Sequence, residues 1–510
     1  MHDDPTFDSL IKMVEEDRSV DEIKSYVSSL ERYWKTLLES QTLNVLADRY
    51  ATETREIFSP LGRIVSEREL WIAVMKGQRD LGLNIPSEDI EKFEVAKNDV
   101  DLSLIREIEA NTKHDVKARI EAFVKAAGAS EQIHRGMTAR DLTDNVEQMQ
   151  NRAAARLIFG RYVSVLRHLA DKANEYKDII LTARTHHQAA QPTLLGRRLA
   201  MSAEELMLHI PDFKSFVESY PLRGIKGPVG TQFDMAVLLG SPEKAEELER
   251  RIAEYLDFSH VLDAPGQVYF RSLDYALLSH LAFLSAACAN FGKNMRLMAG
   301  YELVTEGFSA LQTGSTAMPH KRNTRSSERV CAFSELLKMY ADGASRISGD
   351  QWEEGDVSES VVRRVILPDA FYASDGLCET AMTVLNDMGA YPDRIQREVE
   401  RYMPFLASTR LLSIATKAGI GRETAHEIIK KYAMETWRSG DSLSGFVDNL
   451  AGDNLFASHE VNKDALKSAV SDTEKYVANA RRQTAKIISQ AQELIGAYPK
   501  EAVYEPRPIL

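Results

Sequence analysis

The sequence has few of the residues that mark disulfide-rich, metal-binding or membrane proteins. Only three cysteines occur in 510 residues, too few for a disulfide framework. Neither CxxC nor HExxH spacing is present, so we expect no metal and no cofactor. We expect no membrane association either, because no apolar run approaches membrane-spanning length. Met1-His2-Asp3-Asp4 does not resemble a signal peptide, so we expect a cytoplasmic protein.

Positive charge is also in deficit. The formal net charge of −13 argues against a general nucleic-acid binder, although it allows a local basic pocket. With 44% hydrophobic and 27% charged residues, the chain has the composition of an ordinary soluble globular protein. Its 510 residues indicate about three domains or one elongated helical assembly.

Proline is missing from long stretches, and these stretches predict helices. No proline lies between Pro86 and Pro192, between Pro265 and Pro319, between Pro319 and Pro368, or between Pro404 and Pro499. Such runs, rich in Ala, Leu, Glu, Lys and Arg, favour helices, while strand signals are scarce. We therefore predict an all-α fold, with long helices over residues 144–177, 272–301, 325–347 and 360–388.

Helices of this length usually bury several faces, which indicates a central bundle extended by oligomerisation. We predict three helical domains after an N-terminal extension to which we assign no chemistry. The predicted divisions are the extension at 1–43, an N-terminal helical domain at 44–130, a central long-helix bundle at 131–400 and a C-terminal helical domain at 401–510.

One polar stretch, Gly314-Ser315-Thr316-Ala317-Met318-Pro319-His320-Lys321-Arg322-Asn323, separates two of the predicted helices. Glycine before it gives a permissive backbone, and Lys321 and Asn323 supply hydrogen-bond donors. The next helix is expected to begin near Ser326-Ser327-Glu328. Such a stretch is either a loop that closes over an anion and presents Ser315, or a polar connection without chemistry.

The whole stretch resembles the signature Gly-Ser-x-x-Met-x-x-Lys-x-Asn of the fumarase/aspartase superfamily and matches each of its fixed positions. Asn323 is followed by Thr324, where many relatives have Pro. The resemblance implies a homotetramer in which three separated motifs come from three different subunits. It also makes Ser315 the residue that takes a proton from the substrate, and Arg329 a residue that meets the substrate.

A second motif is Arg184-Thr185-His186-His187-Gln188, just before Pro192. Histidine is the natural proton donor near neutral pH. The motif resembles Arg-Thr-His-Gly-Gln of the adenylosuccinate lyases, which implies that His186 is the general acid and that Thr185 contacts substrate. His187 stands where Gly is common in that family, so either ring remains a candidate for the proton donor.

Three earlier motifs also resemble that family. Arg49-Tyr50 either binds a phosphate through the Arg49 guanidinium and the Tyr50 hydroxyl, or is a surface ion pair beside a packed ring. His114-Asp115 resembles a His-Asp pair that lies near the substrate in that family, whereas on its own His114 would be a helix-surface or satisfied core histidine. Thr138 lies in a motif similar to His-x-Gly-x-Thr-Ser-x-Asp, from which Ala139 departs, and Asp141 or Thr143 is a plausible N-cap for the next helix.

Later motifs extend the resemblance to about Asp375. It implies that Gln267 contacts the substrate and that Ser360 and Arg364 contact its nucleotide. Arg363 can instead be read as an exposed arginine at a helix N-terminus.

The implied reaction is β-elimination of fumarate from adenylosuccinate and from succinylated aminoimidazole carboxamide ribotide. Removing a weakly acidic proton beside a carboxylate and expelling a nitrogen requires a base and an acid, here Ser315 and His186. Lys321, Asn323 and Thr138 would stabilise the charge that builds on the β-carboxylate. Two alternatives remain: another superfamily lyase, such as an argininosuccinate lyase, class II fumarase or carboxymuconate cycloisomerase, or a catalytically silent helical scaffold.

Overall fold

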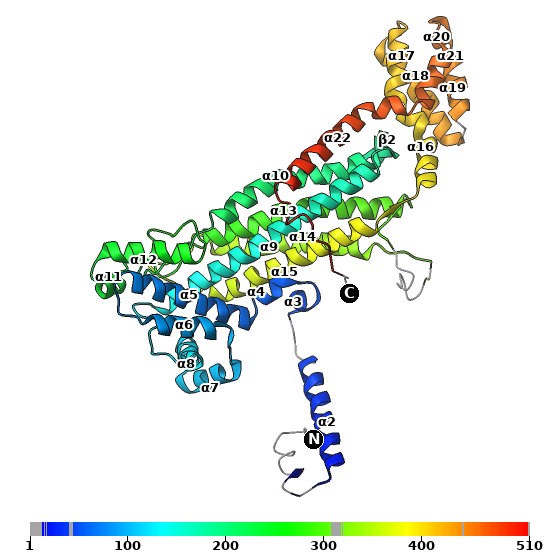
Figure 1. The fold of residues 1–510 in the computed structure, drawn as a ribbon. Coiled ribbons are helices and arrows are strands. Elements are labelled where there is room, and N and C mark those ends of the chain that lie inside the picture. Colours follow the sequence, from blue (N-terminus) through cyan, green and yellow to red (C-terminus); the bar gives the residue numbers. More distant parts are fainter. Residues whose placement is uncertain are drawn as a thin grey trace. The chain divides into compact units, whose positions relative to one another are not determined.

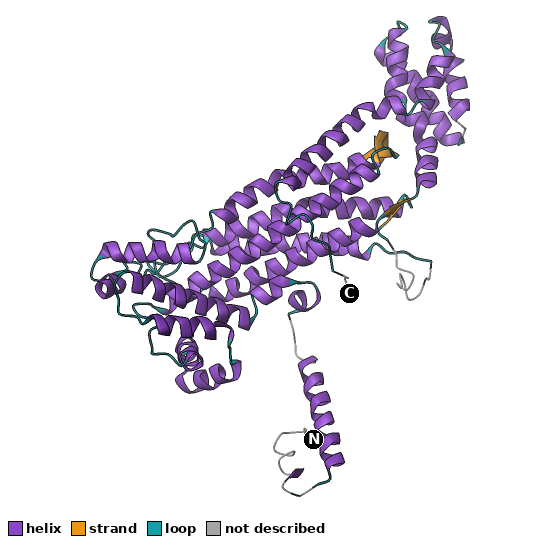
Figure 2. Cartoon of the chain, in the orientation of Figure 1, coloured by secondary structure: helices purple, strands orange, loops and turns teal. Residues whose placement is uncertain are grey.

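The computed structural model describes residues 13–14, 16, 18–39, 44–307, 318, 320–440 and 443–507. The chain divides into two compact units, Met1–Arg49 and Tyr50–Leu510. Helices dominate both units (Figures 1 and 2), which confirms the all-α prediction. The first unit contains α2 (Val20–Glu39) and α3 (Val45–Arg49). The three-domain division stays a prediction.

The second unit begins with short helices packed on the start of the central bundle. Ser59 illustrates how such helices begin: its hydroxyl accepts a hydrogen bond from the Gly62 N–H (2.9 Å), with Pro60 in the first helical position. The helices here are α4 (Glu53–Ile57), α5 (Pro60–Asp80), α6 (Ser87–Val95), the 3-10 helix η1 (Ala96–Asn98), α7 (Leu102–Thr112) and α8 (Asp115–Ala127).

Five long helices form the central bundle, and four of them are the predicted ones. They pack against one another along their lengths (Figure 1). Two shorter helices, α11 (Phe233–Leu239) and α12 (Pro242–Tyr255), follow the second long helix. The long helices are α9 (Ala139–Glu175), α10 (Leu195–Glu218), α13 (Ser272–Gly300), α14 (Arg325–Ile347) and α15 (Ser360–Asp387).

Among the described helices, α13 alone is long and apolar enough, by length and composition, to cross a membrane. This differs from our expectation that no apolar run approaches that length. The physical reason is its place in the bundle: α13 packs against α10, α14 and α15, and a helix buried on several faces is apolar on several faces.

Two short antiparallel pairs interrupt the helices, and the sequence did not predict them. β1 (Ile180–Thr185) and β2 (Gln188–Leu194) form a hairpin, and β3 (Val304–Thr305) pairs with β4 (Gly389–Ala390). In the first pair Thr185 lies opposite Gln188, so a two-residue turn joins the strands.

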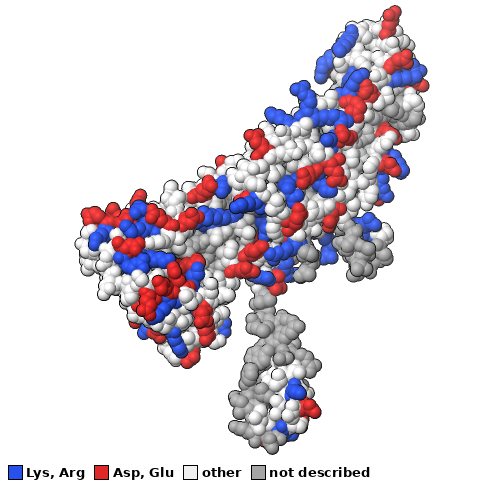
Figure 3. Space-filling view, in the orientation of Figure 1, with Lys and Arg blue, Asp and Glu red and all other residues white. Residues whose placement is uncertain are grey.

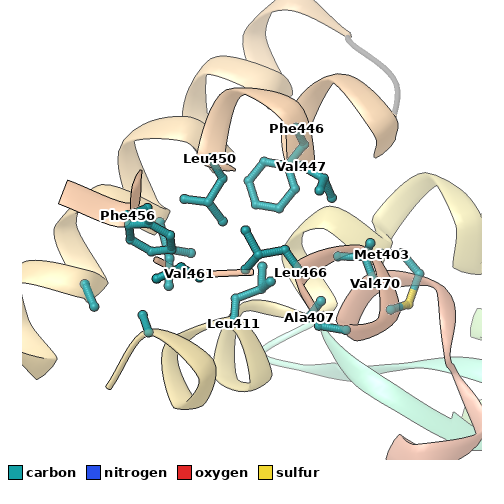
Figure 4. Close-up of a cluster of buried hydrophobic side chains, with 14 of the residues drawn as sticks. Met403, Ala407, Leu411, Phe446, Val447, Leu450, Phe456, Val461, Leu466 and Val470 are labelled. Atoms are coloured by element: carbon teal, nitrogen blue, oxygen red, sulfur yellow. The ribbon is translucent and has the colours of Figure 1, made fainter. Parts of the chain in front are cut away.

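The C-terminal helices have a core of their own (Figure 4), in which Leu411, Phe446, Phe456 and Leu466 are fully buried. α22 then returns along α9 and α10 of the bundle. The helices are α16 (Pro392–Leu406), α17 (Ser408–Lys417), α18 (Arg422–Ser439), α19 (Leu443–Ala451), α20 (Asn454–Ser458), α21 (Lys463–Ser471) and α22 (Glu474–Gly496).

Candidate active site

His186 and His187 form the turn of the β1–β2 hairpin. Their φ angles are 48° and 64°, so both adopt the left-handed conformation that a two-residue hairpin turn of this kind requires. Both side chains are exposed, as is Thr185 at the end of β1. His187 Nε2 lies 3.2 Å from the Tyr301 hydroxyl. No hydrogen bond to the His186 ring occurs among the described residues, so this ring is the one left available for a ligand.

Arg184 fastens the hairpin to its surroundings. Its guanidinium donates to Glu398 of α16 (2.5 Å) and lies 4.2 Å from the ring centre of Tyr301. Burial alone would lower the pKa of Arg184, but the contacts with Glu398 and Tyr402 outweigh burial and raise it. Arg184 is therefore a cation held in place between the hairpin, α16 and Tyr301.

Ser315 and most of the signature stretch lie outside the described residues. On its far side Lys321 is exposed, Asn323 is half-buried, and α14 begins at Arg325, close to the predicted helix start. On its near side the buried Glu306 carboxylate accepts the N–H groups of Ser326 (3.1 Å) and Ser327 (3.0 Å). The residues on both sides of the stretch are thus joined at the N-terminus of α14.

Tyr50 and Arg329 come together in the second unit. The Arg329 guanidinium lies 5.3 Å from the centre of the Tyr50 ring, which also meets Phe333 edge-on at 5.1 Å. A cation beside a phenolic hydroxyl suits a phosphate group. Arg49, exposed at the end of α3, belongs to the first unit.

The His114 motif lies at the start of α8. The His114 ring is the N-cap, and its Nδ1 accepts the Lys117 N–H at 3.3 Å. Burial would raise the pKa of Asp115, but Arg119 (2.9 Å) and the Val116 N–H together lower it. Burial lowers the pKa of His134 and outweighs Asp141, which raises it, and the nearby His114 lowers it further. Both His114 and Asp115 are exposed and can reach a ligand.

Thr138 is the N-cap of α9, so the prediction that Asp141 or Thr143 caps this helix is wrong. The helix begins at Ala139, which places Asp141 in its first turn, where its carboxylate accepts the Thr138 N–H (2.7 Å). The fully buried Arg223 donates to Asp141 (2.5 Å) and to the Gly266 carbonyl (3.0 Å). One buried ion pair therefore joins the Thr138 segment to the loop that carries Gln267.

Gln267 is half-buried, and its backbone N–H donates to the Glu354 carbonyl (2.6 Å), six residues before Ser360. Ser360 opens α15, and Arg364 is exposed just over one helical turn later. The reading of Arg363 as an exposed arginine is wrong. Its side chain is 2% exposed because it is held by Asp274 (2.7 Å) and Glu147 (2.8 Å), which fixes the start of α15 against α13 and α9.

The predicted site residues thus fall into separate groups within one chain. The Asp141–Arg223 ion pair links the Thr138 segment to the loop that carries Gln267, and the Gln267 N–H meets Glu354, six residues before Ser360. Tyr50 meets Arg329. The hairpin with His186 lies beside α16, whereas α7 and α8, which flank His114, lie at the other end of the central bundle (Figure 1). Within the described part of the second unit, a single copy therefore keeps His114 and His186 apart.

Sequence reasoning missed Tyr301, Glu306 and Glu398, and gave Arg223 no role. Glu306 carried a weak signal, an acidic residue directly before Gly307 and the signature stretch. Tyr301 and Glu398 carried none, because their partners are far away in the sequence.

The charges of the described chain give no sign of a nucleic-acid surface or a metal centre. On the face shown in Figure 3, basic and acidic side chains are interspersed. Within the described ranges, no group of three or more His, Cys, Asp or Glu residues is placed to hold a metal ion. The absence of a cofactor stays an expectation.

Two family models match the chain. The model described as "Lyase" matches residues 49–334, and that described as "Adenylosuccinate lyase C-terminus" matches residues 404–487. The adenylosuccinate lyase of Saccharomyces cerevisiae is 32% identical over 391 residues, which cover 76% of this chain and 81% of the yeast protein. That of Schizosaccharomyces pombe is 31% identical, with 87% of this chain and 93% of that protein covered.

A solved structure, the 3-carboxy-cis,cis-muconate lactonizing enzyme from Pseudomonas putida, superposes with a TM-score of 0.77 over 88% of this chain and 99% of that one. Its 20% identity establishes a shared fold alone. The matches to the two family models and to the yeast relatives establish the family as well as the fold: the chain belongs to the adenylosuccinate lyase family.

Proposed function

We propose that this protein is an adenylosuccinate lyase, which eliminates fumarate from adenylosuccinate to give AMP. We further propose that it also cleaves the succinylated aminoimidazole carboxamide ribotide to give AICAR. The observation that carries the proposal is the match to both family models, one across the motifs and one across the C-terminal helices. The C-terminal match favours this activity over those of other lyases with the same fold, because that model describes adenylosuccinate lyases.

The chemistry requires a proton to leave carbon and another to reach nitrogen. Ser315 is the base and His186 the general acid in this proposal. The exposed ring of His186, to which the described residues make no hydrogen bond, supports its role, whereas the His187 ring already meets the Tyr301 hydroxyl. Lys321, Asn323 and Thr138 hold the β-carboxylate, where negative charge develops as the carbon–hydrogen bond breaks.

The remaining predicted residues bind the rest of the substrate. Arg49 and Tyr50 bind the phosphate, and the cation of Arg329 beside the Tyr50 ring supports this role. The substrate-binding set is completed by His114, Asp115, Thr185, Gln267, Ser360 and Arg364.

We propose a homotetramer with active sites shared between subunits, acting in the cytoplasm. Large apolar side chains are exposed on four helices of the bundle, where a monomer would leave them in water. They are Met201 and Leu208 on α10, Phe283 and Leu297 on α13, Met339 on α14, and Val361 and Val365 on α15. The three cysteines are unpaired, which suits a reducing compartment.

Turnover of adenylosuccinate, followed by ultraviolet absorbance and by fumarate release, tests the proposal. We expect Ser315→Ala and His186→Ala each to lower kcat by about 10²–10⁴-fold. His459→Ala, which removes an imidazole from the C-terminal helices, serves as the control and should keep wild-type turnover. Fumarate release from argininosuccinate in place of adenylosuccinate would support a different lyase, and no turnover with any of these substrates would support the silent scaffold.

A further inference from the structure

The turn that carries His186 is unusual in its residues. Among the described residues, His186 and His187 are the one place where two consecutive non-glycine residues have φ in the left-handed region. Turns of this geometry favour Asn-Gly or Gly-Gly, because a Cβ in the left-handed conformation costs about 1–2 kcal/mol per residue. Something outside the turn must therefore stabilise it.

Tyr301 supplies that stabilisation. It follows the last residue of α13, and its hydroxyl meets His187 Nε2 at 3.2 Å. The two rings also pack, with centres 5.6 Å apart and planes inclined by 43°. The tip of the hairpin is thereby attached to the end of a long bundle helix.

Tyr301 is in turn held from its ring face by Arg184, whose guanidinium lies 4.2 Å from the ring centre. Arg184 sits where the hairpin register shifts, between Ala183 and Arg184, and donates to Glu398 of α16. Arg184 in β1 therefore contacts Tyr301, and Tyr301 contacts His187 at the tip of the same hairpin. We call Arg184, His187, Tyr301 and Glu398 the hairpin clamp.

We propose that His187 is a positioning residue: held by Tyr301, it fixes the conformation of the turn and so aims the neighbouring His186 ring at the leaving nitrogen. This rests on the proposed function, in which His186 is the general acid. His186 and His187 share a peptide bond, so a change in φ at one residue redirects the side chain of the other. Proton transfer requires a donor within hydrogen-bond reach, which a loosened turn does not maintain.

The test separates positioning from folding with variants of the clamp. His187→Gly removes the ring but suits φ near 64°, so the thermal unfolding midpoint should stay equal or rise. We expect kcat to fall about tenfold or more while KM stays within about twofold, because only the transition state needs the aimed ring. Tyr301→Phe keeps the ring for Arg184, loses the hydroxyl and should give the same split between kcat and KM.

Two further variants sharpen the result. His187→Gln places a polar atom near the position of Nε2 and should recover part of the kcat that His187→Gly loses. The double variant His187→Gly/Tyr301→Phe should be no slower than the slower single variant, since both remove one contact. Tyr432→Phe is the matched control: it removes another tyrosine hydroxyl bond of 3.2 Å, to Asp453, and should leave kcat unchanged.

His186→Ala in the same assay distinguishes a failure of the positioning role of His187 from a failure of the proposed function. If it abolishes turnover while both clamp variants match Tyr432→Phe, His187 does not position the acid, and the proposed function stands. If His186→Ala retains wild-type kcat, or the wild type does not turn over adenylosuccinate, the acid assignment fails and the positioning role fails with it.

Discussion

Glu249 and Lys226 form an ion pair that water hardly reaches: Glu249 is 6% exposed, Lys226 is 3% exposed, and their charged atoms lie 2.7 Å apart. Burial raises the pKa of Glu249 to about 7, although Lys226 pulls it down. The carboxylate is close to the buried Asp141 that organises the Thr138 segment, and it takes part in no proposed chemical step. Its titration therefore reports on the stability of this region.

Stability should fall as pH rises through the window between the unfolded and folded pKa values of Glu249, about 4.5 and about 7. In that window the folded protein binds more protons than the unfolded chain, so raising pH favours unfolding, by up to about 3 kcal/mol in total. Glu249→Gln has no such proton to lose. Unfolding midpoints measured across the window should show the wild type losing stability relative to this variant.

Glu246→Gln, which removes an exposed carboxylate from the same helix, is the control for the loss of a charge. A difference between wild type and Glu249→Gln that stays constant with pH, or grows in favour of the wild type as pH rises, would contradict the assignment.

At the scale of elements, the N-terminus of α14 is capped by a residue from outside the helix. The Glu306 carboxylate accepts two backbone N–H groups and the Ser327 hydroxyl (2.8 Å), where the helix dipole also favours a negative charge. This cap fixes the helix just after Lys321 and Asn323, the proposed carboxylate ligands. The cap thus connects the stability of α14 to catalysis.

Glu306→Ala leaves these donors unpaired in a buried place and should lower the free energy of unfolding by about 1–3 kcal/mol. We also expect a lower kcat, because the cap no longer fixes the start of α14, which directly follows Lys321 and Asn323. Glu306→Gln keeps one acceptor oxygen, so its free energy of unfolding and its kcat should lie between those of the wild type and Glu306→Ala. Thermal unfolding and steady-state kinetics measure both effects. Glu302→Ala, which removes an exposed carboxylate nearby, is the control. Equal losses of unfolding free energy in Glu302→Ala and Glu306→Ala would rule out the cap.

The helices were predictable from the sequence because their signals are local. Missing prolines and apolar periodicity placed α9, α13 and α14 close to their observed ends, and the helical pattern of residues 360–388 placed α15 although Pro368 lies inside it. The hairpin was not predictable, since His186-His187 is no turn signal and its geometry depends on Tyr301. The burial of Arg363 was misjudged for the same reason: its partners Asp274 and Glu147 are distant in the sequence.

The motifs themselves were visible in the sequence, but the way they meet was not. Thr138 and Gln267 are joined through Asp141 and Arg223, which lie 82 residues apart in the sequence. Local patterns therefore identified candidate residues, while their arrangement required the fold.

At the scale of the whole molecule, the second unit separates residues that the proposed reaction needs together. The β1–β2 hairpin lies beside α16, and α8 with His114 at its start lies at the other end of the bundle (Figure 1). A symmetric assembly of antiparallel bundles would bring one end of a copy beside the opposite end of its neighbour. The exposed apolar side chains of α10, α13, α14 and α15 provide surfaces for such an assembly.

This arrangement predicts that two inactive variants restore each other. His114→Ala and His186→Ala should each have low turnover alone, because every site lacks one imidazole. After dissociation and reassembly of an equal mixture, a site built from two subunits receives both intact residues with a probability of one in four, so activity should return to about a quarter of wild type.

A mixture of His186→Ala with Ser315→Ala extends the test to the signature stretch. Two samples of the same variant, mixed and reassembled, control for the procedure. If both imidazoles came from one subunit, every intact site would sit within a wild-type chain, the mixture would contain none, and turnover would remain at the level of the separate variants.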